Sequence, residues 1–217
     1  MKIIDTKPFP ASREYDEIVN IPLYRICKVK QIVNLSNYKN IIFQSPSAVI
    51  NFDQINLIED KRIIAMGPGT SNQLRKHGYV AEIPDTEYSS EGVINLINKS
   101  EVTGKTLVIK GEGGLSMISE YLNSASLKAD ELNTYNRQKF GSYIEIKKQF
   151  CNSDLVIFSS ALSVEIYFKY IHNDQENLKF LAVSKRIQNV IESYKKESRV
   201  IDYFSDDLVN EIKLTLT

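Results

Sequence analysis

Short apolar runs alternate along this chain with segments in which apolar residues recur every three or four positions. The runs are rich in Val, Ile and Leu and are bounded by Ser, Gly and Pro, as is typical of buried strands, whereas the longer period indicates helices that bury one face. Strands and helices in alternation predict parallel sheets covered by helices on both faces. We therefore expect an α/β fold.

The predicted strands are Met1–Asp5, Ile41–Gln44, Arg62–Met66, Tyr79–Ile83, Thr106–Lys110, Leu155–Phe158, Phe180–Val183 and Arg199–Ile201. The predicted helices are Arg13–Val19, Ala48–Phe52, Ser71–His77, Glu91–Asn98, Leu115–Asn123, Tyr143–Phe150, Ser163–Ile171, Arg186–Lys195 and Asp207–Leu214. Hydroxyl side chains are favoured helix caps, so Thr70 or Ser71 is expected to cap one helix and Ser89 or Ser90 the next.

Several of these segments repeat in pairs. The matching pairs are 40–49 with 154–164, 62–74 with 179–190, 88–93 with 203–208, and 106–114 with 1–8. The last pair is permuted, because its second member opens the chain ahead of everything else. A permuted repeat predicts two domains, one inserted in the other.

We expect a discontinuous α/β domain at 1–31 and 139–217 and an inserted α/β domain at 32–138, each with a parallel sheet flanked by helices. The chain must then cross twice between the domains. The crossings, 21–30 and 131–137, have extended and partly alternating character. We expect them to pair as a two-stranded hinge.

Serine-rich turns follow matching strands in both halves, at Ser45-Pro46-Ser47 and at Ser159-Ser160. Free backbone N–H groups at a helix start bind anions, although helix capping explains any one such turn equally well. The recurrence of the same hydroxyls in both halves favours a shared site at the carboxyl ends of the strands, where ligands of such folds bind. We predict an anionic ligand held between the halves.

Two glycine turns, Gly67-Pro-Gly-Thr70 and Gly111-Glu-Gly-Gly114, allow close approach of the backbone to a ligand. Neither turn is completed by the third glycine of the dinucleotide motif, and no Walker lysine follows. Glu87 does lie about twenty residues after Gly67, as that motif requires. A nucleotide-binding enzyme therefore stays open as an alternative.

Composition removes several classes of function. Lys plus Arg equals Asp plus Glu, at 27 each, so net charge offers no argument for nucleic acid. No apolar run approaches the roughly twenty residues of a membrane span. His77 and His172 are each isolated from Cys and from clustered carboxylates, so we expect no metal. Cys27 and Cys151 are too few for a disulfide scaffold, and we expect them to be reduced. We expect a cytoplasmic monomer without a cofactor, a nucleic-acid partner or a membrane partner.

Five motifs in order resemble those of uroporphyrinogen-III synthase. They are Ile42-Phe-Gln-Ser-Pro-Ser-Ala-Val49, Met66-Gly-Pro-Gly-Thr70, Ser89-Ser-Glu-Gly-Val93, Val108-Ile-Lys-Gly-Glu-Gly-Gly114 and Thr134-Tyr135. The resemblance covers roughly residues 38–140, and the weaker second copy carries it to the C-terminus. Each motif alone is only moderately specific, but the ordered combination with a permuted repeat is specific.

The resemblance implies a lyase of tetrapyrrole (heme) biosynthesis that needs no metal or cofactor. Its substrate would be hydroxymethylbilane, a linear tetrapyrrole with eight carboxylates. The enzyme would remove water, invert the last pyrrole ring through a spiro intermediate and close the macrocycle as the III isomer. Such a substrate is reactive without help, so control of its conformation would be the main task of the protein.

The resemblance also implies roles for single residues. Tyr135 matches the tyrosine favoured as the acid that assists departure of the hydroxyl. The residues carried over as lining the cleft are Ser45, Ser47, Thr70, Ser90, Gly111, Glu112 and Ser159. The turn pattern adds Gly67 and Ser160 as binding residues.

The second half departs from the family at one turn, where Ser184-Lys-Arg-Ile187 stands in place of the usual Gly-Pro-Thr-Thr. This change removes a hydroxyl and adds charge. We expect Lys185 and Arg186 to bind substrate carboxylates directly. The alternative is a catalytically inactive tetrapyrrole- or anion-binding protein on the same scaffold.

Overall fold

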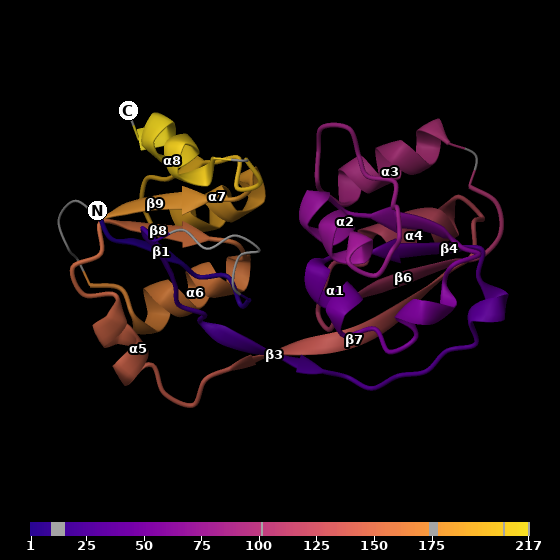
Figure 1. The fold of residues 1–217 in the computed structure, drawn as a ribbon, viewed down its shortest axis with the longest axis horizontal. Coiled ribbons are helices and arrows are strands. Elements are labelled where there is room, and N and C mark those ends of the chain that lie inside the picture. The colour runs from indigo at the N-terminus through magenta and orange to yellow at the C-terminus, as the bar shows by residue number, and fades with distance from the viewer. Residues whose placement is uncertain (10–15, 101, 174–177, 206, 217) are drawn as a thin grey trace. The chain divides into compact units, whose positions relative to one another are not determined.

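The computed structural model describes residues 1–9, 16–100, 102–173, 178–205 and 207–216. The chain divides into two compact units (Figure 1). Unit 1 comprises Met1–Arg25 and Gln138–Thr217, and unit 2 comprises Ile26–Arg137. Each unit carries its own five-stranded sheet flanked by helices. The predicted α/β class with two parallel-rich sheets is confirmed.

The unit 1 sheet has the strand order β10-β9-β8-β1-β2, and each pair of neighbours is parallel. Its strands are β1 (Ile3–Asp5), β2 (Ile18–Asn20), β8 (Leu155–Phe158), β9 (Lys179–Ala182) and β10 (Arg199–Val200). Its helices are α5 (Ile144–Gln149), α6 (Ala161–Tyr170), α7 (Lys185–Ser193) and α8 (Leu208–Leu216). The two faces are covered differently, because α8 packs on one face with Leu208 and Ile212, and α6 packs on the other with Tyr167.

The second sheet has the strand order β3-β7-β6-β4-β5, and the pairs β7·β6, β6·β4 and β4·β5 are parallel. Its strands are β3 (Tyr24–Lys28), β4 (Asn40–Phe43), β5 (Arg62–Ala65), β6 (Thr106–Gly111) and β7 (Ala129–Lys139). The helices of unit 2 are α1 (Pro46–Ile50), α2 (Pro68–Arg75), α3 (Ser90–Lys99) and α4 (Met117–Ser124), with the 3-10 helices η1 (Leu35–Asn37) and η2 (Ile55–Leu57).

Strand β4 shows why the sequence gives continuous apolar runs. Successive side chains of a strand point to opposite faces. Ile41 and Phe43 pack in one core with residues of α1 and α2, whereas Ile42 packs in the other core with residues of α3 and α4. A strand covered on both faces must therefore be apolar at every position.

The chain passes from unit 1 to unit 2 along β3 and returns along β7, and these strands are neighbours in the sheet. The backbone N–H of Val29 donates to the carbonyl of Thr134 at 2.8 Å. Strand β7 is long, running from Ala129 to Lys139. The two crossing segments thus form the expected two-stranded connection.

One predicted strand, Tyr79–Ile83, is wrong. The segment makes a single parallel bridge, between Ile64 and Glu82, and extends no further as a strand. Val80 is 88% exposed, so the apolar pattern of this segment is not matched by burial on two faces. The segment is anchored at its centre by the side chains of Arg62 and Glu82, joined at 2.7 Å.

The predicted helix Arg13–Val19 is also wrong where the structure describes it. Residues 10–15 lie outside the described residues, and Ile18–Asn20 form β2, parallel to β1. The β-branched side chains of Ile18 and Val19 suit a pleated sheet better than a helix.

The expected caps are partly confirmed. Ser89 caps α3, since its Oγ accepts a hydrogen bond from the N–H of Gly92 at 3.2 Å. Thr70 and Ser71 do not cap α2, because the helix begins earlier, with Gly67 at the cap and Pro68 in the first position. Proline is favoured there because its ring presets the helical φ and the missing N–H would have no partner. Within the described ranges, no helix is long and apolar enough to cross a membrane.

Candidate active site

The carboxyl edge of the unit 2 sheet gathers several predicted site residues. Strands β5, β4, β6 and β7 are parallel and therefore end at the same edge. Ser45 follows β4, Gly67 follows β5, and Gly111 ends β6 beside Tyr135 of β7. Ligands of open α/β sheets bind at such an edge.

Tyr135 and Ser45 make a hydroxyl pair at this edge. The Tyr135 side chain belongs to the core of unit 2 and is only 2% exposed. Its hydroxyl lies 2.9 Å from Ser45 Oγ, and either atom can donate. Ser45 Oγ also accepts a hydrogen bond from the N–H of Ala48 at 3.1 Å, capping α1. One serine thus both starts a helix and fixes the phenol.

Gly111 is required by the close approach of Tyr135. A Cβ added at Gly111 would lie 2.4 Å from Tyr135 Cζ, much closer than two carbon atoms can pack. The strand pairing shifts register between Lys110 and Gly111, which brings Gly111 opposite Tyr135. The N–H of Glu112 then donates to the carbonyl of Tyr135 at 2.8 Å. Four predicted residues, Ser45, Gly111, Glu112 and Tyr135, therefore form one contact group.

Arg137 joins this group, although sequence reasoning missed it. Its Nη2 donates to the Tyr135 hydroxyl at 3.1 Å, and its guanidinium carbon lies 5.2 Å from the centre of the same ring. Its Nη1 donates to the carbonyl of Glu112 at 3.3 Å. The available signal was spacing, because residues two apart on a strand share a face. A guanidinium directed at a phenol oxygen stabilises negative charge that develops there.

A buried lysine supports the glycine turn after β6. Lys110 is 3% exposed, and its ammonium donates to the Gly114 carbonyl at 3.0 Å and to Ser116 Oγ at 2.8 Å. The same ammonium pairs with Glu131 at 2.6 Å. Burial alone would raise the pKa of Glu131, but hydrogen bonds from Lys110, Ser119 and Ser116 outweigh it and lower that pKa. A lysine inside an apolar strand was the sequence signal for this network.

Three other predicted residues, Ser47, Thr70 and Ser90, lie in the first turns of α1, α2 and α3, and their side chains are buried. Among the described residues, no hydrogen bond or ion pair joins them to the Tyr135 group, so they lie near helix starts rather than in one cluster. A Cβ added at Gly67 would lie 2.9 Å from Tyr88 Cβ. The start of α2 is therefore packed against the segment that precedes α3.

In unit 1 the predicted serines follow β8. Ser160 Oγ accepts a hydrogen bond from the N–H of Ser163 at 3.1 Å and so caps α6. Ser159 Oγ is buried and has no hydrogen-bond partner, which is rare for a buried hydroxyl and marks an acceptor and donor available to a ligand. Both serines lie at the carboxyl edge of the unit 1 sheet, as expected.

The altered turn places its two cations at the start of α7. Lys185 and Arg186 are the first residues of the helix and both are exposed. The Lys185 ammonium donates to Gln188 Oε1 at 2.9 Å. The cap residue, Ser184, makes no side-chain capping bond. Cations at a helix start oppose the helix dipole, so this arrangement costs stability unless an anion is bound.

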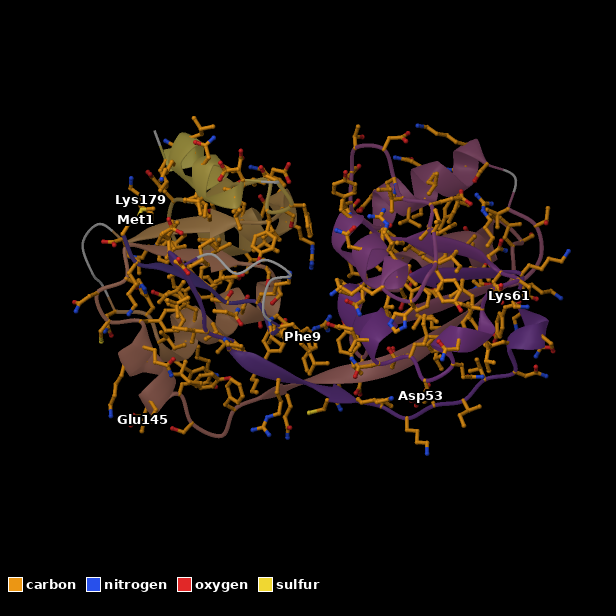
Figure 2. All side chains as sticks on the ribbon, viewed as in Figure 1. Met1, Phe9, Asp53, Lys61, Glu145 and Lys179 are labelled. Atoms are coloured by element: carbon orange, nitrogen blue, oxygen red, sulfur yellow. The ribbon has the colours of Figure 1, made fainter. Side chains whose placement is uncertain are left out.

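A buried carboxyl, Asp5, ends β1 at the same edge. It is 2% exposed and accepts hydrogen bonds from the Tyr203 hydroxyl and from the N–H of Lys7. Burial raises the pKa of Asp5, although Tyr203 and Lys7 partly counter it. Figure 2 labels Phe9, which follows this edge, and Met1 and Lys179, which lie at the opposite, amino edge.

A hollow of about 500 Å³ lies at the amino edge of the unit 2 sheet, where Figure 2 labels Lys61. Two of its cations are already paired, Lys61 with Asp60 and Arg62 with Glu82. It is lined by residues at the starts of β4 and β5, away from Tyr135. Among the described residues there is no cluster of three His, Cys, Asp or Glu side chains able to hold a metal ion.

Comparison with known proteins decides the family. The family model of uroporphyrinogen-III synthase HemD matches residues 16–209. The chain belongs to the uroporphyrinogen-III synthase family. A protein of Methanocaldococcus jannaschii named "Putative uroporphyrinogen-III synthase" is 26% identical over 196 residues, which cover 80% of each chain.

Solved structures agree with this family assignment at the level of fold. The uroporphyrinogen-III synthetase of Helicobacter pylori superposes with a TM-score of 0.71 at 14% identity, covering 100% of this chain and 99% of that one. A mutant uroporphyrinogen III synthase of Thermus thermophilus superposes with a TM-score of 0.60 at 12% identity, covering 99% and 98%. The two-domain α/β architecture is thus that of uroporphyrinogen-III synthases.

Proposed function

We propose that this member of the uroporphyrinogen-III synthase family is an active synthase. Hydroxymethylbilane would lose water, undergo inversion of ring D and close to uroporphyrinogen III. The observation that carries the proposal is the contact group around Tyr135, which combines a fixed phenol, a serine hydroxyl and a guanidinium at the carboxyl edge of the sheet. Family membership supports the same reaction.

The chemistry begins with the departure of a hydroxyl group, which is a poor leaving group until it is protonated. We propose that the Tyr135 phenol gives its proton to this oxygen, so that the C–O bond breaks and water leaves. Arg137 donates a hydrogen bond to the phenol oxygen and would stabilise the negative charge that remains. Ser45 keeps the phenol in one orientation.

The steps that follow need positioning more than acid or base. The carbon that has lost water bonds to the substituted carbon of ring D, giving the spiro intermediate. The older bond from that carbon to the methylene bridge of ring C then breaks, and the bridge bonds to the free α-carbon of ring D, which loses its proton as the inverted macrocycle closes. The linear substrate can also close without inversion, so the enzyme must favour one conformation over another. Effective positioning of two reacting groups is worth on the order of 7–11 kcal/mol of barrier.

Eight carboxylates give the protein many groups to hold. We propose that the hydroxyls and helix starts of unit 2 at Ser45 and Gly67, and those of unit 1 at Ser159 and Ser160, bind substrate carboxylates. Ser47, Thr70, Ser90, Gly111 and Glu112 would complete the unit 2 surface. The exposed cations Lys185 and Arg186 would replace the hydroxyl contacts that the altered turn has lost.

One observation favours an inactive tetrapyrrole-binding protein instead, namely the unsatisfied cap and added charge at Ser184–Ile187. A nucleotide-binding enzyme was favoured only by the two glycine turns. Tyr88 packs beside Gly67 and Tyr135 beside Gly111, so a tyrosine side chain occupies the space next to each of these glycines. These close contacts account for both glycines without a nucleotide, so they favour the synthase over a nucleotide-binding enzyme.

Incubation with freshly made hydroxymethylbilane tests the proposal. The products are oxidised and the I and III isomers of uroporphyrin are separated, with a protein-free incubation as the control. We expect isomer III to predominate with protein, while the control gives isomer I. Formation of isomer I alone would contradict the enzyme proposal, and saturable tetrapyrrole binding without isomer III would identify the inactive binding protein.

A further inference from the structure

Unit 1 contains a second tyrosine–serine pair. The hydroxyl of Tyr24, on the crossing strand β3, donates to Ser160 Oγ at 3.1 Å. Tyr24 is buried, and Ser160 is the cap of α6. In unit 2 the hydroxyl of Tyr135, on the crossing strand β7, contacts Ser45, the cap of α1. Each crossing strand therefore places a phenol on the cap serine of the helix that follows a central strand.

The registers of the two sheets make these positions equivalent. Strands β4 and β8 end at Phe43 and Phe158, and the cap serine follows two residues later in each. In unit 2, Ile42 pairs with Val108 and Val108 pairs with Glu131. In unit 1, Ile157 pairs with Asp5, and Asp5 pairs with Asn20. Ile42 and Ile157 are equivalent, because each is the residue before the last one of its strand. Tyr135 follows Glu131 by four residues (135 − 131), and Tyr24 follows Asn20 by four (24 − 20).

The surroundings of the two phenols differ in a way that separates their roles. Two residues after Tyr135 is Arg137, whose guanidinium donates to the phenol oxygen. Two residues after Tyr24 is Ile26, an apolar side chain. Tyr24 instead donates its hydroxyl hydrogen to Ser160 Oγ at 3.1 Å. The contact between Tyr24 and Ser160 suits holding a partner, rather than donating a proton to a substrate.

Ser160 is the partner that Tyr24 holds. Its Oγ accepts from the Tyr24 hydroxyl and from the N–H of Ser163, each at 3.1 Å, and itself donates to Ser163 Oγ at 3.1 Å. These bonds fix the rotamer of Ser160 and with it the first turn of α6. The neighbouring Ser159 Oγ, buried and unpartnered, is presented from the same turn.

We propose that Tyr24 is a positioning residue of unit 1 that sets the affinity for the substrate by holding Ser160 and the first turn of α6. This inference rests on the proposed function, because the first turn of α6 is taken to bind a substrate carboxylate. Tyr24 thus tunes binding, whereas Tyr135 acts in the chemical step.

Steady-state kinetics of Tyr24→Phe test the inference. Loss of one hydrogen bond should raise KM about fivefold while kcat changes by less than about twofold. Ser160→Ala should raise KM to a similar extent, and the double variant should be no worse than either single one. Ser160→Thr, which keeps the hydroxyl, should restore the parent KM.

Tyr38→Phe is the matched control, because Tyr38 is a buried tyrosine whose hydroxyl donates to Asp130 at 2.6 Å, away from either tyrosine–serine pair. Its KM should equal that of the parent protein. A Tyr24→Phe protein with unchanged KM, or with a fall in kcat at unchanged KM, would overturn the positioning role. So would additive effects of Tyr24→Phe and Ser160→Ala.

Equilibrium binding separates this inference from the proposed reaction. Uroporphyrin III, a stable macrocycle with eight carboxylates, is titrated into the parent protein and into Tyr24→Phe. If the parent forms no isomer III but binds uroporphyrin III about fivefold more tightly than the variant does, the reaction is refuted and the role of Tyr24 stands. Equal affinities would refute the role of Tyr24 alone. A parent protein that neither reacts nor binds would overturn both.

Discussion

The carboxyl edges of the two sheets carry the same tyrosine–serine pair in different electrostatic settings. In unit 2 the Tyr135–Ser45 pair receives a hydrogen bond from Arg137, whereas in unit 1 the Tyr24 hydroxyl donates to Ser160, the cap of α6. The pairing itself follows from capping and strand register, which the sequence repeat preserves in both units. Arg137 stands beside the unit 2 phenol, and a guanidinium there stabilises negative charge that develops on the phenol oxygen.

The ionisable side chains buried behind the two edges also differ, because one is a base and the other is an acid. The turn after β6 is held by the ammonium of Lys110, which pairs with Glu131. The matching end of β1 is held by Asp5, a buried carboxyl bonded by Tyr203. A cation under one edge and a buried carboxyl with a raised pKa under the other give unequal tolerance of substitution and of pH, and four variants probe this inequality.

Lys110→Met should have the largest effect on stability. The variant removes the ammonium from the carbonyls of Gly114 and Leu115 and from Ser116 Oγ, and it leaves Glu131 without its cation, at a cost of about 3 kcal/mol in the free energy of unfolding. The half-buried pair of Lys105 with Asp130 supplies the control, because it is much more accessible to water than Lys110, and Lys105→Met should cost less than about 1 kcal/mol. Equal losses in urea denaturation would show that burial gives the Lys110 pair no special importance.

Gly111→Ala should have the next largest effect on stability. The added Cβ would overlap the Tyr135 ring, and overpacking of a well-filled core costs about 2 kcal/mol. Gly141→Ala is the control, because a Cβ there meets nothing within 4 Å. Thermal denaturation compares the two variants. If Gly111→Ala is as stable as Gly141→Ala, the close approach of Gly111 and Tyr135 is not part of the folded protein.

The double change Lys185→Ala with Arg186→Ala should weaken binding more than it slows turnover. Each exposed contact with a carboxylate is worth about 1 kcal/mol and is screened by salt, so KM should rise and its salt dependence should flatten. Lys147→Ala with Lys148→Ala provides an exposed double control at the end of α5. An unchanged KM, together with greater stability from relief of the helix dipole, would exclude a binding role for these cations.

Asp5→Asn should have the smallest effect and one that depends on pH. Because burial raises the pKa of folded Asp5, the protonated carboxyl is favoured in the folded state, and its contribution to stability is fully present below the ordinary pKa of the group. That contribution is lost as the pH rises through the raised pKa. Asp5→Asn should therefore gain stability relative to the parent as the pH rises, as measured by urea denaturation at a series of pH values. A difference for Asp5→Asn that shrinks with rising pH would contradict this assignment.

The sequence repeat was sufficient to predict the sheets, the helices that cover them and the turns at their carboxyl edges. Those features depend on period and on capping, which are local. The edge segment around Glu82 and the strand at Ile18–Asn20 were misjudged because pairing with a neighbouring strand, not local pattern, decides them. Arg137 and Lys110 escaped notice because their roles arise from contacts with Tyr135 and Glu131 that only the folded strands create.

The equivalence of Tyr24 and Tyr135 was likewise hidden from the sequence. Because the repeat is permuted, Tyr24 lies near the start of the chain, whereas Tyr135 follows the other motifs of its copy. Their equivalence emerges only from the residue pairing between neighbouring strands. A tyrosine among twelve carries no signal of its own. The hydrogen bond to a cap serine provides that signal, and it appears only once both strands are placed.

Turnover of Tyr135→Phe tests the central claim most directly. The variant keeps the ring in the core of unit 2 and removes only the hydroxyl that contacts Ser45 and Arg137. If the phenol is the acid, kcat for formation of isomer III should fall by about ten- to a hundredfold, with little change in melting temperature and with KM unchanged. Full turnover by Tyr135→Phe, or a loss of activity that only parallels a large drop in melting temperature, would contradict a catalytic role for Tyr135.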